Sequence, residues 1–251
     1  MELTTLVTGT GVPVTVVAHG LGATLPQTRA LLGGVPGTKV FPQARGHGSA
    51  PAPSTPGYGE LAADLARVAD SQGATQALGI SMGAATILRL LSSDPTRFDR
   101  VVLFLPASLD GPRRDEEGLS RTSVLATALR TGDRVAALAL VRRELPGDLS
   151  GPLVEAYVDA RVDFLLASPA LPDLFDALAG DRAVPDRGVL SAVTADVLVL
   201  AQEGDALHPA QIGRDLVTVL PHARLVVFDR PGVVFRERRR LRGLIVDHLT
   251  P

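Results

Sequence analysis

The feature that most constrains the fold of this chain is a series of continuous apolar runs of strand length. They are rich in β-branched residues and lie at residues 12–18, 38–41, 76–80, 101–105, 197–201 and 225–228. A strand with one face in water alternates polar and apolar residues, whereas a continuously apolar strand is buried on both faces. These runs therefore predict a parallel sheet that is covered by helices on both sides.

Helical periodicity fills the intervals between the first runs. Residues 58–71 place Leu61, Leu65 and Val68 on one face, and residues 82–92 carry a second apolar stripe. Strands that alternate with amphipathic helices are typical of α/β proteins. We therefore expect an α/β fold with a mostly parallel central sheet and helices on both faces.

The strand pattern stops between residues 107 and 193, where several helical segments are separated by proline and glycine. The clearest of these helices covers residues 153–167, and Ser150 is its candidate N-cap. Because apolar strands resume after this interval, we expect one core, residues 1–106 and 194–251, with a helical cap inserted at residues 107–193.

Composition excludes several classes of chemistry. The 251 residues carry a net charge of −2 and include no cysteine, so disulfides, thiolate metal sites and a cysteine nucleophile are all excluded. The chain starts without a basic and apolar leader, and no run approaches the roughly 18 apolar residues of a spanning helix. We expect a cytoplasmic protein that binds a small molecule and neither nucleic acid nor membrane; the oligomeric state stays open.

The C-terminal segment holds five arginines within seven residues, at positions 236, 238, 239, 240 and 242. Such a cluster can bind phosphate or form the solvated face of a helix. Acidic residues among the arginines and a separate apolar stripe favour the solvated face.

The strongest catalytic motif is Gly79-Ile80-Ser81-Met82-Gly83, which follows one predicted strand and opens a predicted helix. This is the context of a nucleophile elbow, in which a sharp turn holds the serine in a strained conformation with positive φ. The backbone N–H of Met82, at the helix N-terminus, can then stabilise an oxyanion. The alternative is an ordinary glycine-rich turn between strand and helix. If the motif is catalytic, Ser81 Oγ should face a pocket under the cap.

A second small-residue turn, His19-Gly20-Leu21-Gly22, follows the first predicted strand and offers the Leu21 N–H as a second oxyanion donor. With Arg45-Gly46-His47-Gly48, the serine motif and the later segment from Gly204-Asp205 to His208-Pro209, the chain resembles the α/β-hydrolase superfamily. The resemblance implies an α/β-hydrolase fold, a pocket that includes Gly20, and Asp205 as the acid of a catalytic triad.

The same resemblance places the triad histidine in the turn after the last strand, where this sequence has Val233. Valine cannot accept a proton from Ser81, and a serine hydroxyl without a base is a poor nucleophile. Of the five histidines, only His208 is in a loop expected to face the pocket, so it is the candidate catalytic base in place of the missing histidine; the alternative is a structural role in that loop. Because it is three residues from Asp205, we expect that this aspartate does not orient it well, and that Val233→His raises the rate.

The sequence thus leads to two functional hypotheses. The first is a hydrolase of a small apolar ester, lactone or thioester, with Ser81 as nucleophile and with catalysis impaired by the missing histidine. The second is a non-hydrolytic member of the fold, which binds a small molecule or steers a cyclisation or isomerisation in the same pocket. The sequence contains no phosphate-binding, dinucleotide-binding or metal-binding motif, so we expect no cofactor and no metal.

Overall fold

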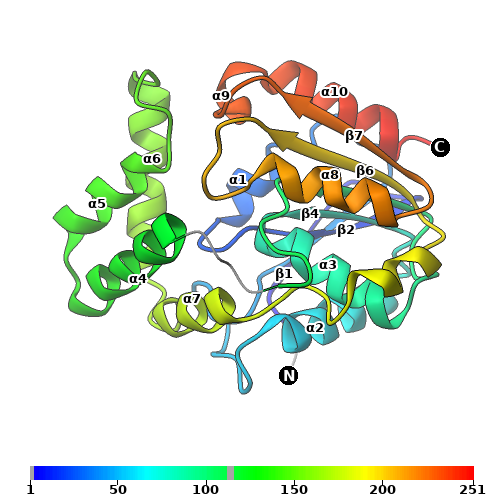
Figure 1. Ribbon diagram of the computed structural model, residues 1–251, viewed down its shortest axis with the longest axis horizontal. Helices are drawn as coiled ribbons and strands as arrows, with labels where there is room; N and C mark the ends of the chain where they lie inside the picture. The colour runs from blue at the N-terminus through cyan, green and yellow to red at the C-terminus, as the bar shows by residue number, and fades with distance from the viewer. Residues whose placement is uncertain (1–2, 112–115) are drawn as a thin grey trace.

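The computed structural model describes residues 3–111 and 116–251, and its centre is a seven-stranded sheet (Figure 1). The strand order is β1-β3-β2-β4-β5-β6-β7, and only the pair β1 and β3 is antiparallel. The strands are β1 (Thr5–Thr8), β2 (Val14–Ala18), β3 (Thr38–Pro42), β4 (Gln76–Ile80), β5 (Arg100–Phe104), β6 (Asp196–Gln202) and β7 (Ala223–Phe228). The mostly parallel sheet predicted from the sequence is confirmed.

The sequence missed the edge strand β1. Its four residues, Thr-Leu-Val-Thr, are half polar, and Val7 is 48% exposed. β1 therefore lacks the continuous apolar run that identified the other six strands, among them the opposite edge strand β7.

Helices cover both faces of the sheet, as predicted. One face packs against α2 (Tyr58–Ser71), α3 (Met82–Ser93) and α8 (Ala210–Val219), and the other against α1 (Leu25–Arg29) and α10 (Arg238–Leu249). The short helix α9 (Val233–Arg236) precedes α10. Neighbouring residues of one strand enter opposite layers: Val101 packs with α3, and Val102 packs with α10.

The described residues between β5 and β6 form helices and no strand. They are α4 (Glu116–Thr131), α5 (Arg134–Arg143), α6 (Pro152–Leu166), α7 (Leu171–Gly180) and the 3-10 helix η1 (Arg187–Ala192). Figure 1 shows α4, α5 and α6 beside the end of the sheet to which β6 and β7 point, whereas η1 lies against α3 and α8. An inserted helical region is therefore present. The boundaries at residues 107 and 193 stay a prediction, and residues 112–115 of that interval are outside the described residues.

The predicted N-cap of α6 is wrong. The helix starts at Pro152 with Gly151 as N-cap, and no side chain caps it. Proline fits the first turn of a helix because its fixed φ is helical and its missing N–H has no partner there anyway. The helix therefore begins after Gly151, and Ser150 is one residue too early to cap it.

Two glycines allow strand β4 and helix α3 to approach their neighbours. A Cβ at Gly83 would lie 2.0 Å from the carbonyl oxygen of Ala18, and one at Gly79 would lie 2.5 Å from the carbonyl oxygen of Gly83. Both distances are shorter than any real contact. The start of α3 is thus held directly against β2, and this contact fixes where Ser81 is presented.

Gly83→Ala should lower the free energy of unfolding by about 1–3 kcal/mol, because backbone must move to admit the methyl group. The matched control is Gly243→Ala in α10, where a Cβ meets nothing within 4 Å. That substitution should raise stability by about 0.5–1 kcal/mol, because alanine loses less backbone entropy in a helix. Urea unfolding of both variants measures the difference; the same sign in both would contradict the packing argument.

Candidate active site

Ser81 lies at the turn between β4 and α3 with φ 51° and ψ −109°. A non-glycine residue rarely adopts positive φ, and such strain persists only where the surroundings enforce it. Here the Ser81 N–H donates to the carbonyl oxygen of Phe104 at 2.9 Å, which ties the turn to the end of β5. The strained conformation predicted for Ser81 is confirmed.

The hydroxyl of Ser81 is hydrogen-bonded to His208. The distance from Ser81 Oγ to His208 Nε2 is 2.9 Å, and His208 Nδ1 lies 2.9 Å from Asp205 Oδ2. The carboxylate fixes the proton on Nδ1, so Nε2 is left to accept the proton of the serine hydroxyl. The sequence-based expectation that Asp205 does not orient His208 well is wrong.

A tight turn explains how two residues so close in the chain can pair. Asp205 Oδ1 accepts the N–H groups of Leu207 at 2.9 Å and of His208 at 3.1 Å, an arrangement in which an aspartate side chain closes its own turn. Gly204 precedes it at φ 69°, in the left-handed region that favours glycine. The turn folds the chain back, so the imidazole reaches the second oxygen, Oδ2.

The same contacts keep Asp205 ionised. Partial burial alone would raise the pKa of this carboxyl, but the hydrogen bond and charge of His208 and the amide of Gln202 hold that pKa well below its usual range. Asp205 is therefore an anion at neutral pH, in position to stabilise a protonated His208.

Val233 stands where the resemblance places the triad histidine, but in the structure it belongs to a buried apolar cluster. Its side chain is 1% exposed and packs among Leu200, Phe228 and Leu241 under the sheet, at the start of α9. The conclusion that Ser81 lacks a proton acceptor because position 233 is valine is wrong, because His208 reaches the hydroxyl from a different loop. Sequence reasoning also missed Gln202, whose only signal is a polar residue at the end of an otherwise apolar strand.

The two predicted oxyanion donors lie at the same cavity as Ser81. Among the described residues, neither the Leu21 N–H nor the Met82 N–H donates to a protein acceptor. Met82 is the first residue of α3, so its N–H lies at the positive end of a helix dipole. Both groups can thus donate to a ligand.

Two buried histidines hold the turn that contains Leu21. His47 Nε2 accepts the N–H of Gly22 at 2.9 Å, and His19 Nε2 accepts the N–H of Ala44 at 3.0 Å. Their Nδ1–H groups donate to the carbonyl oxygens of Arg45 and Gly20. Each ring needs one nitrogen as acceptor and one as donor, so both are neutral. Burial, together with the nearby His19, lowers the pKa of His47 to about 3.

A cavity of about 460 Å³ lies between the carboxyl end of the sheet and the inserted helices. Most of its lining is apolar. Among the polar residues that line it, Arg161 on α6 contacts Glu144 at the end of α5 at 2.9 Å and the Tyr157 hydroxyl at 3.2 Å. All the site residues predicted from the sequence line it: Gly20, Leu21, Ser81, Met82, Asp205, His208 and Val233.

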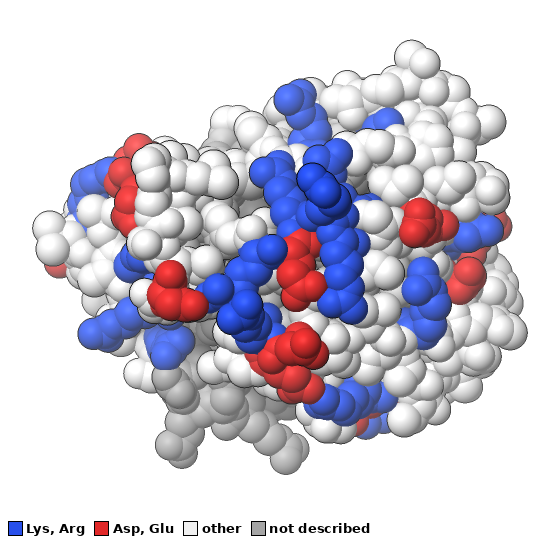
Figure 2. Space-filling view, turned by 90° about the horizontal axis from the view of Figure 1, so that it is seen from above, with Lys and Arg blue, Asp and Glu red and all other residues white. Residues whose placement is uncertain are grey.

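Basic side chains gather on the face that Figure 2 shows, with acidic side chains among them. The arginines around α10 make contacts within the protein: Arg242 donates to the carbonyl oxygen of Gly33, Arg240 covers the ring of Phe228, and Arg236 pairs with Asp148. Because these three arginines are engaged within the protein, the contacts do not favour a phosphate-binding role for the arginine cluster.

Within residues 3–111 and 116–251, no group of three or more His, Asp or Glu side chains is arranged to hold a metal ion. In the same residues, no helix is both long and apolar enough to span a bilayer.

Comparisons with known proteins identify the fold. No family model and no curated protein sequence matches the chain. Solved structures do match: an esterase from Exiguobacterium antarcticum (TM-score 0.83, 19% identity, 99% of this chain and 96% of that one), and the enol-lactonase from Burkholderia xenovorans LB400 (0.79, 23%, 99% and 96%). A third is 2-hydroxy-6-oxo-6-phenylhexa-2,4-dienoate hydrolase from Rhodococcus sp. strain RHA1 (0.76, 22%, 98% and 94%). The chain therefore has the α/β-hydrolase fold.

The free energy of unfolding should fall as the pH is lowered from about 6.5 towards 3. Unfolded His47 binds a proton near its ordinary pKa of 6.5, whereas folded His47 does so only near 3. Between these values the unfolded state binds more protons, and each unit of pKa difference corresponds to about 1.4 kcal/mol. Urea titrations at several pH values measure the slope.

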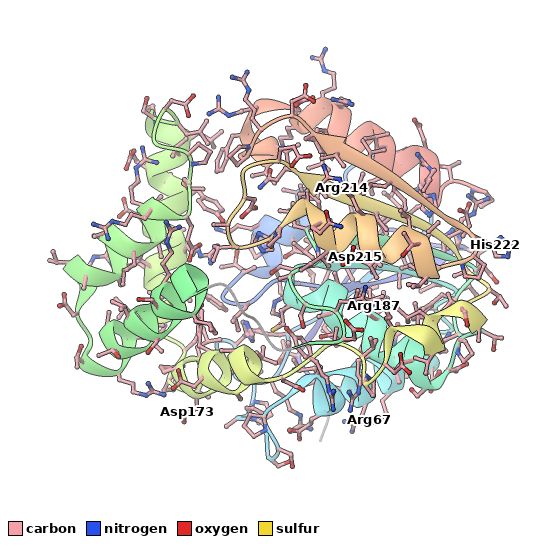
Figure 3. All side chains as sticks on the ribbon, in the orientation of Figure 1. Arg67, Asp173, Arg187, Arg214, Asp215 and His222 are labelled. Carbon is pink, nitrogen blue, oxygen red and sulfur yellow. The ribbon has the colours of Figure 1, made fainter. Side chains whose placement is uncertain are left out.

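His47→Gln should make that slope shallower, although it lowers stability at neutral pH. The matched control is His222→Gln, because His222 is exposed at the end of the sheet away from α4, α5 and α6 (Figure 3). It should leave the slope unchanged. An unchanged slope in His47→Gln would contradict the assignment of the pH dependence to this histidine.

Proposed function

We propose that this protein is a serine hydrolase whose catalytic triad is Ser81, His208 and Asp205. The observation that carries the proposal is the distance of 2.9 Å between His208 Nε2 and Ser81 Oγ, combined with the bond from His208 Nδ1 to Asp205. A nucleophile, a base within hydrogen-bond reach and an anion that orients the base form the arrangement required for acyl transfer.

In the acylation step, Ser81 Oγ attacks the substrate carbonyl carbon while its proton moves to His208 Nε2. Asp205 stabilises the resulting imidazolium. The carbonyl oxygen becomes an oxyanion, which the N–H groups of Leu21 and Met82 stabilise. His208 then protonates the leaving group, and an acyl-enzyme on Ser81 remains.

Deacylation repeats the sequence with water. His208 takes a proton from the water molecule as it attacks the acyl carbon, and returns it to Ser81 Oγ when the acid product leaves. The triad ends in its starting protonation state, so the cycle needs no group beyond these residues and water.

The substrate we propose is a small, largely apolar ester, lactone or thioester. The mostly apolar lining of the cavity supports this class, because it favours removal of apolar groups from water. The names of two structures with the same fold, an esterase and an enol-lactonase, support the same class. We propose no cofactor and no metal.

The non-hydrolytic alternative depended on the missing base. His208 offers a proton acceptor to Ser81, which supports the hydrolytic function over that alternative. It stays as an outcome of the experiment below.

Ser81→Ala and His208→Gln should each lower kcat for an activated aryl ester by about 10⁶-fold, because the members of a triad act as a unit. A fluorophosphonate should label the wild type and fail to label Ser81→Ala. His222→Gln is the control with unchanged rate. If the wild type neither forms an acyl-enzyme nor reacts with the fluorophosphonate, the non-hydrolytic function becomes the better hypothesis.

Val233→His should not raise the rate, in contrast to the expectation from the sequence. Ser81 already has a base, and a polar imidazole placed among Leu200, Phe228 and Leu241 should cost about 1–3 kcal/mol of stability. Steady-state kinetics and urea unfolding of this one variant measure both effects. A rate increase would show that His208 is not an effective base.

A further inference from the structure

Gln202 connects the triad aspartate to the turn that follows β7. It is the last residue of β6 and only 5% exposed. Its Nε2 donates to Asp205 Oδ2 at 2.6 Å, and its Oε1 accepts the N–H groups of Gly232 at 3.1 Å and Val233 at 3.2 Å. One amide side chain thus contacts both the acid of the site and the turn at position 233.

The partners dictate the orientation of this amide. The two N–H groups of the turn need an acceptor, and the Asp205 carboxylate needs a donor. If the amide were rotated by half a turn, its NH₂ would face two donors and its oxygen would face an anion. Only the observed orientation satisfies all three partners. The N–H groups of Gly232 and Val233 therefore determine which end of the Gln202 amide faces Asp205.

The oxygen that Gln202 binds is the oxygen that orients His208. Asp205 Oδ2 accepts both from Gln202 Nε2 and from His208 Nδ1, while Oδ1 is held by the backbone N–H groups of Leu207 and His208. The backbone bonds hold Oδ1, so a donor to Oδ2 restricts the rotation of the carboxylate about that oxygen. The position of Oδ2 is the position of the acceptor that His208 Nδ1 meets.

We infer that Gln202 is a positioning residue for the triad, which acts through Asp205 to hold His208 against Ser81. The turn at Gly232 and Val233 then contributes to catalysis through its two backbone N–H groups rather than through a histidine side chain. This inference rests on the proposed function, because the residues that it positions are those of the proposed triad.

The decisive variant is Gln202→Glu, which keeps the shape and replaces the amide by a carboxyl group. When protonated, that carboxyl donates to Asp205 as the amide does. When ionised, it places a second anion against Asp205 Oδ2, and two carboxylates in contact do not both ionise readily. The ratio of kcat/KM between the variant and the wild type should therefore fall by at least about tenfold as the pH rises from about 5 to about 9. A residue that only fills space would give a constant ratio.

The matched control is Gln211→Glu. Gln211 Nε2 also donates to an aspartate, Asp215 Oδ1 at 2.7 Å, but on the exposed side of α8 and outside the cavity. Gln211→Glu makes the same change in a glutamine–aspartate pair outside the cavity, so the pH profile of kcat/KM should remain that of the wild type. Gln202→Met, which keeps the length but removes donor and acceptor, should lower kcat by about 10- to 100-fold with KM nearly unchanged.

A measurement that does not depend on turnover separates the positioning role of Gln202 from the proposed hydrolase function. The His208 Nδ1 proton, identified in the ¹H NMR spectrum by its loss in His208→Gln, should shift in both Gln202 variants and stay in place in Gln211→Glu. If the wild type hydrolyses no ester but this proton shifts, the proposed function fails and the positioning role stands. If the wild type hydrolyses esters while the pH ratio is constant and the proton does not shift, the positioning role is overturned and the proposed function stands.

Discussion

The geometry of the site depends on the carboxylate of Asp205, which accepts four hydrogen bonds. Two come from the backbone of its own turn, one from His208 and one from Gln202. The backbone bonds bring His208 back over the carboxylate. The carboxylate accepts the hydrogen of Nδ1 and so leaves Nε2 to face Ser81.

The opposite side of the site is built from different contacts. Gly83 brings the start of α3 against β2, which presents Ser81 and the Met82 N–H at the carboxyl end of the central strand β4. His47 holds the turn that carries the Leu21 N–H by accepting from its neighbour Gly22. Ser81 and the N–H groups of Leu21 and Met82 are thus held by glycine packing and by the side chain of His47, whereas His208 is held by Asp205 in the loop between β6 and α8.

The sequence predicted most strands of the sheet and the turn that carries Ser81. Continuous apolar runs identified six of the seven strands, because burial on both faces demands apolar residues along the whole strand. The glycines at 79 and 83 identified the turn at Ser81, because only residues without a Cβ allow that approach. The edge strand β1 escaped because its residues share the half-polar pattern of ordinary loops.

The sequence named His208 as the candidate partner of Ser81 but left open whether it reaches the hydroxyl. Position 233 correctly suggested that the turn after β7 carries no base, but whether His208 takes its place depends on the path of the chain from Asp205 to His208. That path is set by the side chain of Asp205, which closes its own turn. Asp205 in turn contacts Gln202, whose other two partners come from 30 and 31 residues away. The sequence by itself determined the layers of the fold and the strained serine, because these follow from local residue size and polarity. Only the tertiary structure decided which histidine contacts Ser81, because hydrogen-bond partners from distant segments must meet before the direction of a side chain is fixed.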